Sequence, residues 1–222
     1  MIIHRAWRSL PAWFLLAALA AASAHPASGD VCNFPVRVAV DTTQTDTTVL
    51  AWGCRGYGQV FLATDTLIQS ISIWRPAQPA LDGRPRYLFI TETFVNPADS
   101  RVYPDVERLL LDAGSLVNLV GDGIHPVEYR WVFDPPFALP YRGRFFFDIL
   151  ASFFSSWLIP AATADPYPDG EAWETGPVVD CSPGWPRASP PQADLVFEVR
   201  FCATGATPAL PKSWGRLKVM YR

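Results

Sequence analysis

Charged residues are scarce in this chain of 222 residues, because Asp, Glu, Lys and Arg together make up 18% of it, against roughly 25% in an average soluble domain. The 18 basic residues do not outnumber the 21 acidic ones, so a nucleic-acid partner has no electrostatic support. Half of the residues are hydrophobic, which is more than a disordered chain contains. We therefore expect a folded protein that does not bind nucleic acid.

The local motifs of common enzyme classes are also missing. The sequence has no Gly-x-Ser-x-Gly, no His-Glu-x-x-His and no phosphate-binding glycine loop, the patterns that present a nucleophile, a zinc ion or a nucleotide. Glu92, Glu128 and Glu198 fall in separate predicted strands, and nothing in the sequence pairs two of them as a glycosidase requires. We expect a protein that is not an enzyme.

The start of the chain has the pattern of a secretory signal peptide. Arg5 and Arg8 precede an apolar run at 12–20, and Ala22-Ser23-Ala24 supplies the small residues that a signal peptidase requires. No later stretch reaches about 18 apolar residues without a charge or a proline, so we expect no transmembrane segment in the mature chain. The predicted location is secreted or at the cell surface, or periplasmic if the envelope has an outer membrane.

Cysteines are few, and export would carry all four into an oxidising compartment. No two of them have the short spacing of a zinc knuckle, so two disulfides are favoured over a metal site. Cys32, Cys54, Cys181 and Cys202 can pair in three ways. We favour Cys32 with Cys54 and Cys181 with Cys202, because each pair closes a loop of about twenty residues, worth roughly 3 kcal/mol in the chain-entropy model.

The hydrophobic pattern predicts β-structure. The 22 prolines are scattered, which argues against long helices, and apolar and polar residues alternate from Pro35 onward, as in strands with one solvated face. The segment 106–111 is either one helical turn or a further strand. The other expected strands lie at 36–40, 48–52, 59–63, 70–73, 87–93, 115–120, 128–133, 145–150, 153–159 and 194–202.

This pattern predicts an all-β fold, an antiparallel sandwich of two sheets. We expect a signal peptide over 1–24, an N-terminal spacer over 25–31, the sandwich over 32–203, and a linker with a basic tail over 204–222. A long proline-rich loop is expected over 163–191, and loops of this length in compact domains are functional or disordered.

Several segments, taken in order, resemble bacterial secreted jelly-roll domains that are related to the galactose-binding-like sandwiches and often occur in surface-anchored proteins. The segments that carry this resemblance are Gln59–Phe61, Leu67–Trp74, Val132–Pro140, Gly143–Phe147, Asp165–Gly170, Ala172-Trp173 and Asp194–Phe197. The resemblance implies a jelly-roll sandwich that acts as a non-catalytic module, either binding a glycan or cell-surface component or building the cell exterior. The chain departs from many such proteins because it has no LPxTG-like signal.

Glycan binding would use flat apolar rings that stack on the faces of sugars. The expected ligand-binding residues, in or beside the proline-rich loop, are Trp157, Tyr167, Trp173 and Trp185. The alternative is that these rings fasten the loop to the core, in which case the protein is purely structural.

The residue types allow two metal sites. Asp165, Asp169 and Glu171 place hard oxygen ligands in one turn-rich segment, which suits calcium, although turn and cap chemistry explains them equally well. A more remote alternative is copper-dependent oxidation of polysaccharides, in which His25, as the mature N-terminus, and His125 would hold the metal.

Overall fold

The computed structural model describes residues 32, 35–77, 85–116, 121–152, 156–176, 184, 186–187 and 194–202. All of them belong to the unit Val31–Arg222. The predicted signal peptide, spacer and tail lie outside the described residues, as do His25, Cys181 and Trp185.

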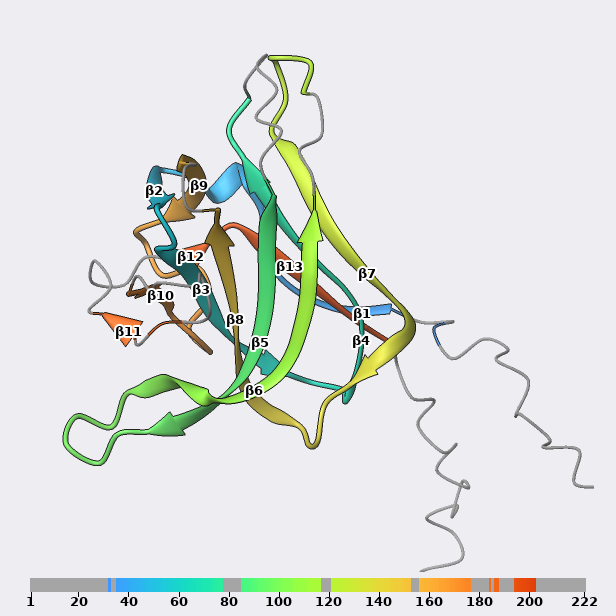
Figure 1. Cartoon of the computed structure of the whole chain (residues 1–222), viewed down its shortest axis with the longest axis vertical. Coiled ribbons are helices and arrows are strands. Elements are labelled where there is room, and N and C mark those ends of the chain that lie inside the picture. Colours follow the sequence, from blue (N-terminus) through green and yellow to red (C-terminus); the bar gives the residue numbers. More distant parts are fainter. Residues whose placement is uncertain are drawn as a thin grey trace, which may run out of the picture. The chain divides into compact units, whose positions relative to one another are not determined.

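The described residues form an all-β structure, as predicted (Figure 1). Its only helical element among them is a single 3-10 turn over Thr42–Gln44. No helix in this part of the chain has the length and apolar character needed to span a bilayer. The strands are β1 (Pro35–Val40), β2 (Thr47–Trp52), β3 (Gly56–Ala63), β4 (Leu67–Arg75), β5 (Arg86–Val95), β6 (Val102–Leu116), β7 (Val127–Ala138), β8 (Gly143–Ala151), β9 (Ser156–Ala162), β10 (Ala172–Thr175), β11 (Pro186–Arg187), β12 (Asp194–Leu195) and β13 (Phe197–Cys202).

The strands form three sheets, and every pairing is antiparallel. The sheet orders are β1-β13-β4-β7, β11-β10-β3-β8-β5-β6 and β12-β9-β2. The prediction of two sheets was therefore incomplete. The third sheet exists because β2 pairs with β9 instead of with its sequence neighbour β3.

One hydrophobic core unites the three sheets. The four-stranded sheet contributes Val199 and Ile71, the six-stranded sheet contributes Phe61 and Phe147, and the small sheet contributes Ile159. This shared core is what a sandwich requires. It follows from the alternating sequence pattern, because residues two apart on a strand lie on the same face.

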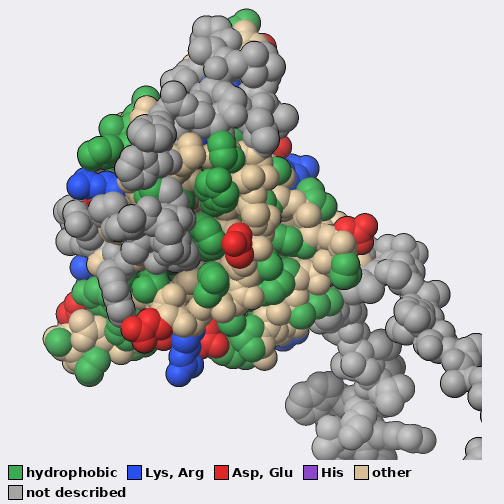
Figure 2. Space-filling model, in the orientation of Figure 1, with side chains coloured by type: hydrophobic (Ala, Val, Ile, Leu, Met, Phe, Trp, Pro, Cys, Tyr) green, Lys and Arg blue, Asp and Glu red, His purple; other side chains and the backbone are tan. Residues whose placement is uncertain are grey.

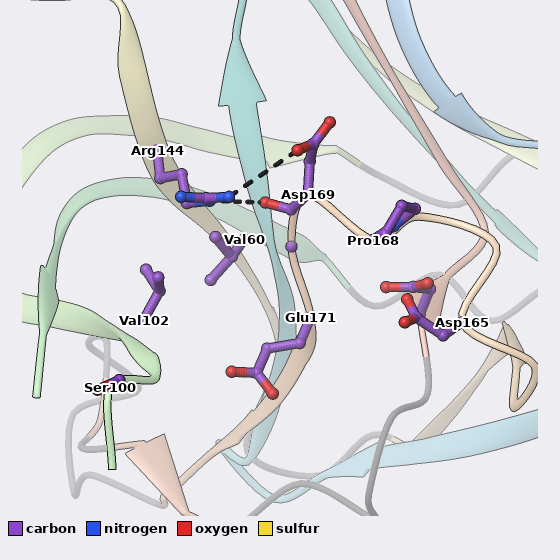
Figure 3. A pocket seen from close by; sticks show the side chains of 10 residues that line it. Val60, Ser100, Val102, Arg144, Asp165, Pro168, Asp169 and Glu171 are labelled. Atoms are coloured by element: carbon purple, nitrogen blue, oxygen red, sulfur yellow. Dashed lines mark hydrogen bonds and ion pairs between the residues drawn. The ribbon is translucent and has the colours of Figure 1, made fainter. Parts of the chain in front are cut away.

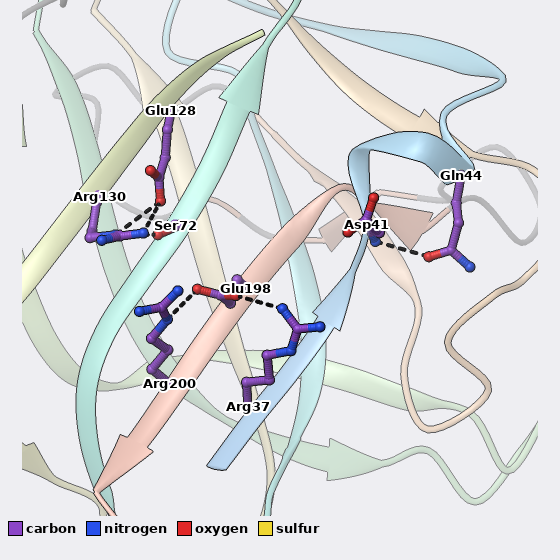
Figure 4. A network of polar contacts seen from close by, with 8 residues as sticks. All are labelled: Arg37, Asp41, Gln44, Ser72, Glu128, Arg130, Glu198 and Arg200. Carbon is purple, nitrogen blue, oxygen red and sulfur yellow. Dashed lines mark hydrogen bonds and ion pairs between the residues drawn. The ribbon is translucent and has the colours of Figure 1, made fainter. Parts of the chain in front are cut away.

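The opposite face of the four-stranded sheet is polar (Figure 4). On β13, Glu198 accepts hydrogen bonds from Arg200 Nε at 2.5 Å and from Arg37 Nη1 at 3.4 Å. On β7, Arg130 Nε donates to Ser72 Oγ at 3.1 Å and to Glu128 Oε1 at 2.9 Å. This side of the sheet is polar, as predicted, and its charges form local pairs, but Ser72 and Glu198 are buried and not solvated.

The six-stranded sheet is covered on its second face as well. Val60, Phe146 and Trp173 form a separate buried cluster there, with Val102 and Tyr103 packed against it. This cluster explains why β3 and β8 are apolar on both faces. On the molecular face seen in Figure 2, charged side chains lie mainly at the margins, while hydrophobic and other uncharged side chains cover the middle.

Three segments differ from the prediction. The segment 106–111 is part of β6, so its helical alternative is wrong. The proposed loop over 163–191 contains β10, which pairs with β3 and joins the six-stranded sheet. The expected strand 194–202 is interrupted at Val196 and contributes to two different sheets.

The disulfide pairing also corrects the prediction. Cys32 is bonded to Cys202, across a sequence separation of 170 residues and with a Cα–Cα distance of 4.3 Å, and Cys54 is disulfide-bonded too. The favoured pairing of neighbours is therefore wrong. The reason is strand order: β1 and β13 are adjacent and antiparallel, with Pro35 opposite Cys202, so the start of the sandwich meets its end.

Candidate functional site

The described part of the chain contains a polar cavity of about 320 Å³ beside the predicted calcium segment (Figure 3). Its polar lining residues come from a turn after β9, from the loop before β6, and from β8 and β12. The lining residues are Val60, Ser100, Val102, Arg144, Asp165, Pro168, Asp169, Gly170, Glu171 and Asp194.

A tight turn shapes one wall of this cavity. The Gly170 N–H donates to the Tyr167 carbonyl oxygen at 3.2 Å, and Pro168 and Gly170 stand where a type I turn favours proline and glycine. Gly170 is required for packing, because a Cβ there would lie 1.8 Å from the Val60 carbonyl oxygen. The turn can therefore lie directly on β3, and the Val60 N–H donates to the Glu171 carbonyl oxygen at 3.0 Å.

Asp165 lies two residues before this turn and has an uncommon backbone conformation. Its φ is +50°, in the left-handed region that residues other than glycine seldom adopt. Asp and Asn are the side chains that tolerate this region best. The conformation places an exposed carboxylate at the cavity.

Asp194 is the buried carboxyl of the site, and it joins three segments. Its Oδ1 accepts from Gln59 Nε2 at 2.8 Å, and its Oδ2 accepts from the Tyr167 N–H at 2.9 Å. The other end of the Gln59 amide accepts from the Leu195 N–H at 2.9 Å. Asp194 and Gln59 therefore hold β12, β3 and the turn in one place.

The electrostatics of Asp194 are unusual for a carboxyl. Burial raises its pKa to about 6, and its hydrogen bonds from Gln59 and Tyr167 oppose that rise only in part. Asp165 adds to the rise, through its negative charge and through a hydrogen bond between the two side chains. Two carboxyl groups in contact favour a shared proton.

The remaining charges of the cavity are arranged as ion pairs (Figure 3). Arg144 Nε donates to the Asp169 carbonyl oxygen at 2.8 Å, and its Nη2 lies 3.8 Å from Asp169 Oδ1. Arg101 Nη2 donates to Glu171 Oε2 at 2.6 Å. The arginines therefore fix two of the four carboxylates, while Asp165 and Asp194 face each other.

These pairings bear on the calcium hypothesis. Asp165, Asp169 and Glu171 line the same cavity. Yet among the described residues no group of three or more His, Cys, Asp or Glu side chains is placed to hold a metal ion. The three carboxylates are thus brought to one cavity but not to one ligand set, because arginines occupy Asp169 and Glu171.

The predicted aromatic platform is not formed by the rings that the structure describes. Trp157 is 4% exposed, Tyr167 9% and Trp173 1%, so these rings cannot lie against a sugar, and the sequence prediction is wrong for them. Tyr167 packs edge-on against Phe197 and accepts a hydrogen bond from the Leu62 N–H at 2.8 Å. Tyr167 and Trp173 pack the loop against the sandwich, while Trp157 lies on β9 and packs against Tyr129.

Trp173 shows how this fastening works. Its ring centroid lies 4.5 Å from that of Tyr103 and 4.7 Å from the Arg101 guanidinium. Arg101 lies in the loop between β5 and β6, and Tyr103 lies near the start of β6. The β5–β6 hairpin therefore covers the Trp173 ring. Trp185, the fourth predicted ring, lies outside the described residues.

No protein-family model matches this chain, and no curated protein is significantly similar to it. The resemblance to galactose-binding-like domains consequently stays a prediction.

His125, the described half of the proposed copper pair, is exposed, and its Nδ1 lies 2.6 Å from Asp122 Oδ2. The Asp122 carboxylate also accepts from the Ile124 and His125 N–H groups, both at 2.8 Å. These hydrogen bonds lower the pKa of Asp122 well below its usual range. A turn therefore explains the described residues here, while His25 lies outside them.

Sequence reasoning missed Gln59, Arg144 and Asp194 as site residues. A signal existed for Gln59, because it is a polar residue on the buried face of an apolar strand. No local signal marks Arg144 or Asp194, because each acquires its role from a partner at least 25 residues away.

Proposed function

We propose that this protein is a non-catalytic binding module that recognises a hydroxyl-rich glycan in the cavity at Asp165 and Asp194. The observation that carries the proposal is the buried carboxyl of Asp194, held by three segments and in contact with the exposed carboxyl of Asp165. A carboxyl with a raised pKa that lies in a cleft beside a specific charge partner is a candidate for a functional site.

The chemistry of the lining favours a particular class of glycan. Carboxylates accept hydrogen bonds from sugar hydroxyls or from an amino sugar, and Arg144 can donate. Val60, Val102 and Pro168 add apolar surface. Arg144 and Arg101 pair with Asp169 and Glu171, which leaves Asp165 and Asp194 as the other acids of the lining. Neutral or amine-bearing glycans are therefore expected ligands in preference to uronic acids and sulfated sugars.

Binding is favoured over glycoside hydrolysis by the contact between the two carboxyl groups. Glycosidases separate their catalytic carboxyls by about 5 to 9.5 Å, to leave room for the sugar or for a water molecule. Asp165 instead raises the pKa of Asp194 through its charge and a hydrogen bond, and Asp194 is already held by Gln59 and Tyr167.

The proposal includes a jelly-roll topology. When β10 and β11, which extend one edge of the six-stranded sheet, are left aside, eight strands of the two larger sheets remain, in sequence order β1, β3, β4, β5, β6, β7, β8 and β13. One sheet then reads first-eighth-third-sixth and the other second-seventh-fourth-fifth, an order that two interlocked Greek keys produce. An extracytoplasmic location is supported by the Cys32–Cys202 disulfide, since disulfides persist in oxidising compartments.

The test is a glycan array that carries neutral, amine-bearing and acidic glycans, followed by titration calorimetry of the best ligand. We expect Asp165→Asn to weaken binding about tenfold or more, because one charged hydrogen bond is worth roughly 1.5 to 3 kcal/mol. Asn tolerates the left-handed backbone at this position, so the variant keeps its fold.

Glu128→Gln is the matched control, because it also removes one carboxylate charge but lies in the polar network of the four-stranded sheet. Its affinity should equal that of the wild type. Absence of binding to every glycan, a preference for acidic glycans, or equal losses in both variants would overturn the proposal and favour a purely structural role.

A further inference from the structure

Strand β2 forms one edge of the three-stranded sheet, and its composition is unusual for an edge. The strand order is β12-β9-β2, so no strand of the described structure pairs with the far side of β2. Natural proteins protect such an edge with charges, prolines or β-bulges, because unpaired backbone groups attract a further strand. The β2 sequence, TTVLAW, contains no charge and no proline. Its register with β9 runs without a shift from Thr47 to Trp52, so β2 has no bulge either.

The other described edges of the three sheets carry these protections. In the four-stranded sheet, β1 contains Arg37, and β7 contains Pro135 and Pro136. In the six-stranded sheet, β11 begins with Pro186, and the register of β6 with β5 shifts at three points. The opposite edge of the small sheet, β12, contains Asp194. β2 therefore differs from the other edges in having no protection of its own.

The backbone of β2 directs alternate residues toward its open side. The Val196 N–H donates to the Pro160 carbonyl oxygen at 2.9 Å, so Pro160 turns its backbone toward β12 and away from β2. Thr48 lies opposite Pro160, and in an antiparallel pair two opposite residues turn their backbone groups either both toward each other or both away. The next pair of the same kind is Leu50 with Leu158. Thr48 and Leu50 therefore direct their N–H and C=O groups away from β9.

The exposed side chains of β2 form an uncharged and largely apolar stripe. Leu50 is 47% exposed and Trp52 is 48% exposed, and Thr48 is exposed as well. These three side chains share one face of the sheet, because residues two apart on a strand lie on the same face. Leu158, opposite Leu50 on β9, adds a further apolar side chain at 37% exposure. The open edge thus combines backbone hydrogen-bonding groups with apolar side chains.

This edge is complementary to a second copy of itself. Antiparallel pairing centred on Leu50 would place Leu50 of the two copies opposite each other and Thr48 of each copy opposite Trp52 of the other. The outward backbone groups of Thr48 and Leu50 would then face a partner strand, as hydrogen-bonded pairs require. Contacts that repeat in both directions make the isologous interface of a two-fold dimer. A strand of another protein would find no charge on β2 to fix its orientation or to exclude its competitors.

We infer that β2 is a dimerisation edge, to which a second copy of this chain adds its own β2 in the antiparallel direction. The two three-stranded sheets then become one continuous sheet, and the added strand binds the outward backbone groups. The Leu50 and Leu158 side chains of both copies form an apolar row across the junction. This inference is independent of the proposed glycan site, to which β2 contributes no lining residue.

The test is sedimentation velocity of the full mature protein over a wide range of concentrations, with hydrogen exchange measured at both ends of that range. We expect a reversible equilibrium between monomer and dimer. Exchange of the Thr48 and Leu50 amides should be slower in the dimer, because each gains an acceptor across the junction. A monomer at every concentration, or a dimer in which these amides exchange as fast as in the monomer, would overturn the inference.

Leu50→Lys tests the register, because it places two positive charges opposite each other at the centre of the dimer. Its dissociation constant should rise at least about tenfold, and an equimolar mixture with Leu50→Glu should recover a heterodimer. Val132→Lys is the matched control, because Val132 is an exposed residue of β7, at 64%, and should leave the dimer unchanged. Equally tight dimers of Leu50→Lys and Val132→Lys, or no heterodimer in the mixture, with all variants folded by circular dichroism, would contradict the inference.

Discussion

At the scale of single residues, two glycines and one carboxyl show how tightly the six-stranded sheet is packed on its second face. Asp148 is fully buried there and accepts a hydrogen bond from Thr175 Oγ1 at 3.2 Å. A Cβ on Gly56 would lie 2.5 Å from Asp148 Oδ1. A Cβ on Gly58 would lie 2.0 Å from the Phe147 carbonyl oxygen. Because Gly56 and Gly58 have no side chain, β3 can lie close to Asp148, Phe146 and Phe147 of the neighbouring strand β8.

Gly58→Ala should consequently be severely destabilising, by roughly 3 kcal/mol or more, because the clash is with backbone and with the Phe146 ring. Gly114→Ala is the matched control. Its φ is +69° but nothing lies within 4 Å of the added Cβ, so backbone strain alone should cost about 1 kcal/mol. Urea denaturation of both variants measures the difference. Equal losses of stability would show that β3 can shift to accept a side chain.

At the scale of elements, the sandwich is closed by contacts between segments distant in sequence. β1 and β13 are joined by six registered residue pairs and by the Cys32–Cys202 disulfide. β12 is joined to β3 through Asp194 and Gln59, which are 135 residues apart. These elements are short, so their stability depends on their partners more than on local propensity.

Replacing both Cys32 and Cys202 with serine should lower the free energy of unfolding by several kcal/mol. Closing a loop of 170 residues is worth about 5 kcal/mol in the chain-entropy model. The loss should appear as a lower midpoint of denaturation with the native far-ultraviolet spectrum retained before the transition. A midpoint unchanged from that of the wild type would mean that β1 and β13 need no covalent link.

At the scale of the whole molecule, buried acids make stability depend on pH. Burial raises the pKa of Asp148 to about 7 and is the largest cause of the rise for Asp194, to about 6. An unfolded chain returns both pKa values to about 3.9. Between these values the native state binds protons that the unfolded state does not, so the free energy of unfolding falls as pH rises.

We therefore expect a more stable protein at pH 5 than at pH 8, with the contribution of both acids fully present below about pH 4. Asp148→Asn should flatten this dependence and be more stable than the wild type at pH 8, by up to a few kcal/mol. Denaturation midpoints at several pH values measure both effects. A wild type that is more stable at pH 8, or an unchanged slope in Asp148→Asn, would contradict this account.

The sequence alone determined the all-β character, because apolar and polar residues alternate along many of the strands whatever each strand pairs with. It also drew attention to Asp165, Asp169 and Glu171, since a turn with proline and glycine is encoded locally. It could not assign the partner of Cys32, the burial of Trp173 or the role of Asp194. Those depend on which strands become neighbours, and strand order is decided by contacts between distant segments, which a local pattern does not record.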